Sequence, residues 1–142
     1  MKVRYKLIFA GVLLMAGIVL FGCGSKEFSQ NDLLHHNFVL TEVNGEAFTG
    51  EKIPNLQFNE GFRVSGAVCN SYAGQAELVG DILYVRQLAT TKMLCFDQKL
   101  NELEFTFGNM LMNGARLKFE EDVLTLKGEG HSLKFETADY QN

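Results

Sequence analysis

The sequence lacks the motifs that identify the common catalytic sites. It contains no P-loop, no G-x-S-x-G, no H-E-x-x-H and no paired C-x-x-C, so the classes of enzyme that these motifs mark receive no support. Histidine is scarce, and His35, His36 and His131 could meet only after folding. We therefore expect a protein without enzyme activity, cofactor or metal. A hydrolase with an unrecognised site is an alternative.

Basic residues are outnumbered by acidic ones, with 13 Lys and Arg against 17 Asp and Glu in 142 residues. Three of the basic residues, Lys2, Arg4 and Lys6, lie in a segment that we expect to be removed. Their loss lowers the basic count to 10 and the net charge from −4 to −7. Such an acidic chain is not expected to bind nucleic acid or to dock electrostatically on anionic lipid.

The N-terminal segment has the pattern of a secretory signal. The three basic residues precede an uncharged apolar run from Leu7 to Leu20, and Phe21-Gly22-Cys23 closes the segment. Its end resembles the bacterial lipobox, in which the cysteine is lipidated and becomes the first residue. The apolar run is shorter than the roughly 18 residues that a transmembrane helix needs, so a lipoprotein signal is favoured over an anchor or an ordinary signal peptide.

This pattern divides the chain into three parts: a lipoprotein signal peptide at 1–22, a lipidated tether at 23–28 and a folded domain at 29–142. Acyl chains on Cys23 would attach the protein to the membrane. Gly24 follows this cysteine, whereas an aspartate there commonly signals inner-membrane retention in Gram-negative lipoproteins. We therefore expect an outer membrane lipoprotein that faces the periplasm.

Two cysteines, Cys69 and Cys95, remain once Cys23 is acylated. An even pair in an oxidising compartment is most simply a disulfide. It would span a separation of 26 residues and stabilise the fold by about 3 kcal/mol in the chain-entropy model. A free buried pair and a metal site are the alternatives, although structural zinc takes four ligands and no histidine lies nearby in the sequence.

Helical signals appear in two places. Ser29 and Asp32 are placed as the N-cap and the capping-box acid of a short N-terminal helix. Asp97 is placed as the N-cap of a longer helix at about 98–112, and Gly114 follows where a C-terminal glycine belongs. The apolar residues recur on one face of this longer helix, which predicts that it covers the core.

The remainder of the domain has the period of short β-strands. Residues 116–120 and 132–136 alternate charged and apolar side chains, and Asn44-Gly45 is a strong hairpin signal. This pattern predicts an α+β fold: a curved, mainly antiparallel β-sheet or open barrel of about seven to eight short strands, with one main covering helix. Four glutamates are expected on solvated faces: Glu102, Glu104, Glu120 and Glu121.

Several short motifs resemble the META domain family, and within it the HslJ-type heat-shock lipoproteins. The most specific is the combination of Ser65-Gly66-x-x-Cys69-Asn70 with the later Thr91-x-Met93-x-Cys95. The other motifs that carry the resemblance are 34–40, 43–45, 88–90 and 100–103. One departure is the absence of tryptophan, which opens the first strand in many META domains; Phe38 would fill that role here.

The resemblance implies a compact β-rich fold with one main helix. It also implies a periplasmic-side lipoprotein, associated in that family with heat stress and novobiocin resistance, and it carries over no catalytic residues. We therefore expect a non-enzymatic, stress-protective envelope lipoprotein that is a monomer. An inhibitor or assembly partner of another envelope protein is the alternative. Such a partner would be bound by an exposed loop at Asn70, Ser71 and Tyr72, with Tyr72 as the anchor, or by a sheet edge.

Overall fold

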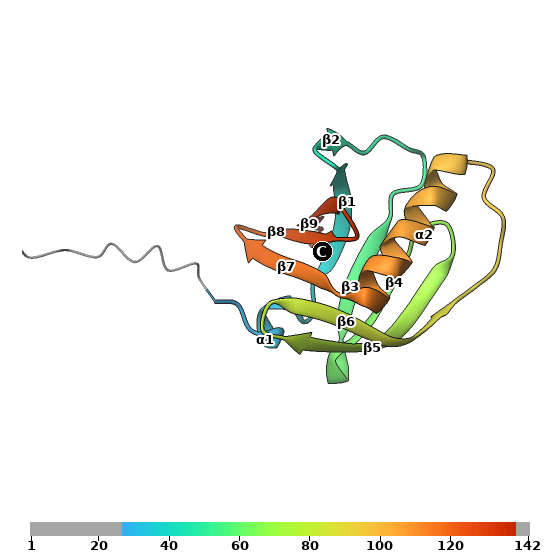
Figure 1. Cartoon of the computed structure of the whole chain (residues 1–142). Coiled ribbons are helices and arrows are strands. Elements are labelled where there is room, and N and C mark those ends of the chain that lie inside the picture. The colour runs from blue at the N-terminus through green and yellow to red at the C-terminus, as the bar shows by residue number, and fades with distance from the viewer. Residues whose placement is uncertain (1–26, 139–142) are drawn as a thin grey trace, which may run out of the picture.

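The computed structural model describes residues 27–138, and the strands of this region close into a barrel (Figure 1). The strands are β1 Asn37–Val43, β2 Glu46–Ala47, β3 Asn55–Asn59, β4 Arg63–Ala67, β5 Ser71–Val79, β6 Ile82–Thr90, β7 Ala115–Glu120, β8 Val123–Gly128 and β9 His131–Thr137. The helices are α1 Gln30–Leu33, a 3-10 turn Glu60–Phe62 and α2 Gln98–Asn113.

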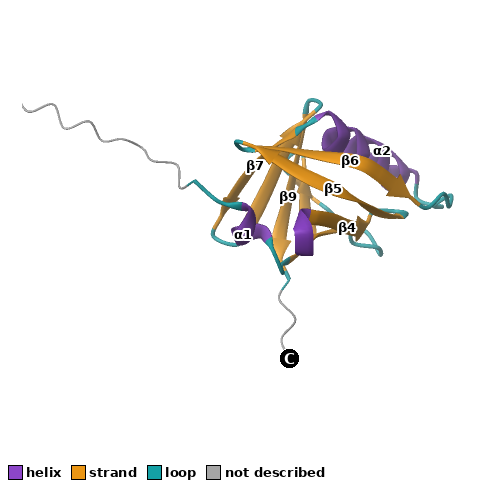
Figure 2. Cartoon of the chain, turned by 90° about the horizontal axis from the view of Figure 1, so that it is seen from below, coloured by secondary structure: helices purple, strands orange, loops and turns teal. Residues whose placement is uncertain are grey.

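The sheet is antiparallel throughout and runs in the order β2-β1-β3-β4-β5-β6-β7-β8-β9. Pairing of β1 with β9, through Leu40 and Phe135 among others, closes eight strands into a ring and leaves β2 outside it. The predicted α+β fold is confirmed, and the sheet is a closed barrel. Figure 2 shows the barrel from below, with α2 against one side.

Alternation along each strand sends apolar side chains into the barrel, which is why these short segments form strands rather than helices. Leu117, Leu124, Leu133 and Phe135 are all buried. Phe38 is fully buried and packs edge-on against two other phenylalanine rings. A phenylalanine therefore occupies the core at the position expected to replace a tryptophan.

Helix α2 begins at its predicted cap and closes the barrel core. The Asp97 carboxylate accepts hydrogen bonds from the backbone N–H groups of Lys99 and Leu100, as an N-cap does. The Phe107 ring reaches inward, with its centroid 5.4 Å from that of Tyr72 and 6.0 Å from that of Phe135. The helix is therefore held by its buried face, as the apolar period predicted.

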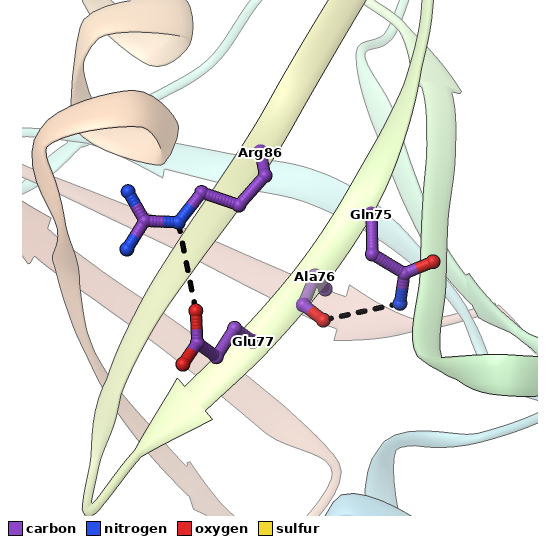
Figure 3. Close-up of polar contacts among 4 residues, drawn as sticks. All are labelled: Gln75, Ala76, Glu77 and Arg86. Atoms are coloured by element: carbon purple, nitrogen blue, oxygen red, sulfur yellow. Dashed lines mark hydrogen bonds and ion pairs between the residues drawn. The ribbon is translucent and has the colours of Figure 1, made fainter.

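The β5–β6 hairpin presents polar side chains on its outer surface (Figure 3). Arg86 Nε lies 3.5 Å from Glu77 Oε2, and both side chains are more than half exposed, so this ion pair contributes little to stability. Gln75 Nε2 donates to the carbonyl oxygens of Ala76 and Gly61. The Gln75 side chain thus joins the hairpin to the neighbouring 3-10 turn.

The described chain enters the barrel at the end opposite the loop that connects β6 to α2 (Figures 1 and 2). Glu27–Ser29 line an open groove together with Gly80 and Asp81, which form the β5–β6 turn. The predicted signal peptide and the lipidated Cys23 lie outside the described residues. Within residues 27–138, no helix has the length and apolar character needed to cross a membrane.

Candidate interaction site

The loop between β6 and α2, residues 91–97, contains no helix or strand. Residues 91–95 form neither a turn nor a bend, and none of the seven residues has a positive φ. The segment follows β6 directly, and Thr91 N–H donates to Ser71 O at 3.0 Å. We call residues 91–97 the display loop.

The Asn70 side chain holds the backbone of Met93 at two points. Asn70 Oδ1 accepts from Met93 N–H at 2.6 Å, and Asn70 Nδ2 donates to Met93 O at 3.0 Å. The Thr91 hydroxyl donates to Asn70 Oδ1 at 3.1 Å. One amide side chain therefore fixes the first half of the display loop to the barrel.

Asn70 is itself positioned by a carboxylate from α2. Glu104 Oε1 accepts from the backbone N–H of Asn70 at 2.5 Å, and Glu104 Oε2 accepts from Asn70 Nδ2 at 2.8 Å. Glu104 was expected on a solvated face, and that prediction is wrong, because it is partly buried against Asn70. A buried amide needs such partners, since an unsatisfied polar group costs about 1–3 kcal/mol.

A second amide and the two cysteines hold the other half of the loop. Asn101 Nδ2 donates to Cys95 O at 2.8 Å, and Cys95 N–H donates to Asn101 Oδ1 at 3.3 Å. Cys69 and Cys95 form a disulfide in the structure, with their Cα atoms 5.9 Å apart, a spacing in the usual range. Lys52 Nζ also donates to Cys69 O. The backbone of both disulfide-bonded cysteines is therefore held by a side chain from elsewhere in the domain.

Three of the side chains that the display loop presents to solvent are apolar, beside the exposed Thr91, Lys92 and Asp97. Exposed fractions are 72% for Met93, 94% for Leu94 and 108% for Phe96. Phe105 on α2 is 73% exposed. Isolated exposed apolar residues are normal, but several such side chains from one short segment are typical of an interaction site.

The loop that was predicted to bind a partner is built differently. Ser71 and Tyr72 belong to β5, and Asn70 is buried. Tyr72 is buried too, and its hydroxyl donates to Asn55 O at 2.8 Å. The prediction that Tyr72 is an exposed anchor is therefore wrong, and burial raises the pKa of its phenol.

The absence of a side chain at Gly66 makes room for the Tyr72 ring. A Cβ at Gly66 would overlap Asn55 O and lie 2.6 Å from the Tyr72 hydroxyl oxygen. The missing side chain leaves the space that the tyrosine fills, a use of glycine that depends on a cross-strand partner rather than on a turn. The motif glycine therefore serves packing.

His131 lies away from the adjacent pair His35 and His36, and the three have different partners. His131 Nδ1 lies 3.1 Å from Asn44 Nδ2, His35 pairs with Glu60 at 3.3 Å, and His36 packs beside Phe38. Within the part of the chain that the structure describes, no three His, Cys, Asp or Glu side chains are grouped as metal ligands. The display loop is accordingly the feature with the clearest capacity to bind.

Comparisons with known proteins agree with this fold. The META domain model matches residues 31–140. Over 129 residues the chain is 35% identical to the heat shock protein HslJ of Escherichia coli (strain K12), covering 88% of this chain and 92% of that protein. A protein whose structure was solved by NMR is 35% identical, with a TM-score of 0.74. The match covers 81% of this chain and 99% of the chain in that structure. Another, from Burkholderia xenovorans, is 20% identical, with a TM-score of 0.61 and coverages of 77% and 86%, and supports the fold alone.

Proposed function

Because the chain belongs to the META domain family and is related to a heat shock protein, we propose that it is a non-enzymatic envelope lipoprotein that protects the cell under heat and novobiocin stress. It acts by binding another protein through the display loop. Three observations support this proposal: the lipobox-like Phe21-Gly22-Cys23, the relationship to HslJ, and the exposed apolar side chains.

The observation that carries the proposal is the combination of rigidity and exposure in the display loop. Backbone atoms on both sides of Leu94 are held by Asn70 and Asn101, while the Leu94 side chain is 94% exposed. A loop that is ordered before binding loses less conformational entropy when it binds. Met, Leu and Phe side chains supply the apolar area that a stable protein interface needs.

The position of the tether favours a protein over the anchoring membrane as the partner. Cys23 lies four residues before Glu27. A chain of four residues spans at most about 14 Å, which limits the distance between Cys23 and the domain. Glu27 lies beside the Asp81 end of β6, and the display loop follows the Thr90 end. Eight residues of strand separate these ends by roughly 26 Å, so we expect the loop to face away from a bilayer that holds Cys23.

Deletion of the gene tests the protective role. We expect reduced survival under heat and novobiocin, restored by the wild-type gene and not by Cys23→Ala, because the variant lacks the residue that would be acylated. Cell fractionation should recover the wild type with the outer membrane and release Cys23→Ala into the soluble fraction. Unchanged survival of the deletion strain would remove the stress role, and inner-membrane recovery would overturn the sorting prediction.

A further inference from the structure

We propose that the display loop occupies the active-site cleft of an endopeptidase whose S1 pocket accepts an apolar side chain, with Leu94 in that pocket, and that the protein inhibits this enzyme. The inference rests on the proposed function, because it names the class of partner that the display loop binds. It is carried by the backbone of the loop as much as by its side chains.

The backbone units on both sides of Leu94 are held by side-chain amides, and Leu94 itself is not. Extended segments can add as a strand to a partner, with main-chain hydrogen bonds giving affinity and side-chain pockets giving specificity. Met93 and Cys95 each bind one side-chain amide through both their N–H and their carbonyl group, as residues in a β-ladder bind a neighbouring strand. Among the described residues, no hydrogen bond engages Leu94 N–H or Leu94 O, whereas the N–H and carbonyl groups of Met93 and Cys95 are held by side-chain amides. Leu94 is left free to pair with an enzyme.

The surrounding scaffold distinguishes an inhibitor from a substrate. Attack on the Leu94 carbonyl by the serine hydroxyl of a chymotrypsin-like enzyme would form an acyl-enzyme ester at Leu94 and release the Cys95 amine, which takes up the serine proton through the catalytic histidine. Water would then hydrolyse the ester to a Leu94 carboxylate. Neither end could depart, because Met93 stays bound to Asn70, and Cys95 stays bound to Asn101 and through its disulfide to Cys69. The Cys95 amine is therefore placed to attack the acyl-enzyme ester before water does; this attack restores the peptide bond and returns the proton to the serine, so the enzyme stays occupied.

The side chain at position 94 sets the class of enzyme. Chymotrypsin has a hydrophobic S1 slot, whereas trypsin has an aspartate there and selects cations. Leu94 suits the first pocket and not the second. Since Leu94 is 94% exposed and makes no buried contact, it can be replaced without loss of the fold.

The test uses the full-length exported protein, solubilised in detergent, against chymotrypsin and trypsin with small chromogenic peptides as reporters. We expect the wild type to inhibit chymotrypsin. Leu94→Lys should weaken that inhibition by about 30-fold or more, as expected for an interface residue worth about 2 kcal/mol, and should create inhibition of trypsin. Val79→Lys is the matched control, because Val79 is 55% exposed at the far end of β5, and it should change neither.

Three results would overturn the inference: no inhibition of chymotrypsin by the wild type, no change of specificity in Leu94→Lys, or rapid cleavage of the loop without inhibition, which mass spectrometry after reduction would detect. If survival under stress depends on the display loop and any of these three results is obtained, the proposed function is retained. Only the inference that the partner is an endopeptidase is then wrong. Unchanged survival of the deletion strain, together with inhibition of chymotrypsin, would overturn the proposed function and leave the peptidase inference intact.

Discussion

Asn70 and Met93, 23 residues apart in the chain, are joined by two hydrogen bonds between one side-chain amide and one backbone unit, at 2.6 Å and 3.0 Å. The pair links the end of the β4–β5 connection to the display loop. Because Asn70 is buried and Leu94 is exposed, the order of the loop depends on contacts that a binding partner would not touch.

Replacement of Asn70 by alanine should destabilise the protein strongly. Asn70→Ala removes the side-chain bonds to Met93, Thr91 and Glu104 and leaves buried groups without partners, which predicts a loss of about 2–4 kcal/mol. Urea unfolding measures this loss. Asn59→Ala is the control, since the Asn59 side chain makes one exposed bond to Ser65, and it should cost under about 1 kcal/mol. Equal losses in the two variants would contradict the role of Asn70.

The disulfide should form in the natively exported protein. A free-thiol assay on the denatured, unreduced protein should find no reactive thiol at Cys69 or Cys95. The Cys69→Ser/Cys95→Ser double variant should lose about 3 kcal/mol of unfolding free energy. Two reactive thiols in the exported protein would show that the disulfide does not form and does not hold the display loop.

Tyr72 should make stability depend on alkaline pH. Burial raises the pKa of its phenol above the ordinary value of 10.0, so the native state keeps a proton that the unfolded chain releases. The stabilisation is fully present below about pH 10 and falls as the pH rises further, by up to about 1.4 kcal/mol per pH unit. Urea unfolding at pH 9 and pH 11 should show a smaller decline for Tyr72→Phe than for the wild type; equal declines would contradict the burial of the phenol.

The exposed side chains of the display loop should contribute little to folding. Met93→Ser, Leu94→Ser and Phe96→Ser should each change the unfolding free energy by less than about 0.5 kcal/mol, as surface substitutions do. Leu100→Ala, at a buried position in the first turn of α2, should cost about 2–5 kcal/mol. Thermal denaturation compares them, and a large loss at Phe96 would mean that its ring packs on the domain.

Much of the fold could be predicted because its signals are local. Charged and apolar residues alternate over 116–120 and 132–136, and Asp97 and Gly114 mark the ends of α2, whose last residue is Asn113. Closure of the barrel was not predictable in this way, because β1 and β9 meet across almost the whole domain. Local periodicity carries no information about such a distant pairing.

The candidate site was harder to predict because its contacts are long-range. Asparagine is a common residue in turns, yet Asn70 is bound by Glu104, which lies 34 residues away in the sequence. Tyr72 is buried in a space that is open because residue 66 is a glycine. A sequence signal for the display loop did exist. Met93-Leu94-Cys95-Phe96 is an apolar run directly before the helix cap Asp97, where polar loop residues are usual.

The central claim is that the protein acts through the display loop, and complementation of a deletion strain tests it most directly. The Met93→Ser/Leu94→Ser/Phe96→Ser variant, checked for export and thermal stability, is compared with Val79→Ser under heat and novobiocin. We predict that Val79→Ser restores wild-type survival and that the loop variant survives no better than the deletion strain. Full restoration of survival by a stable, exported loop variant would contradict the claim.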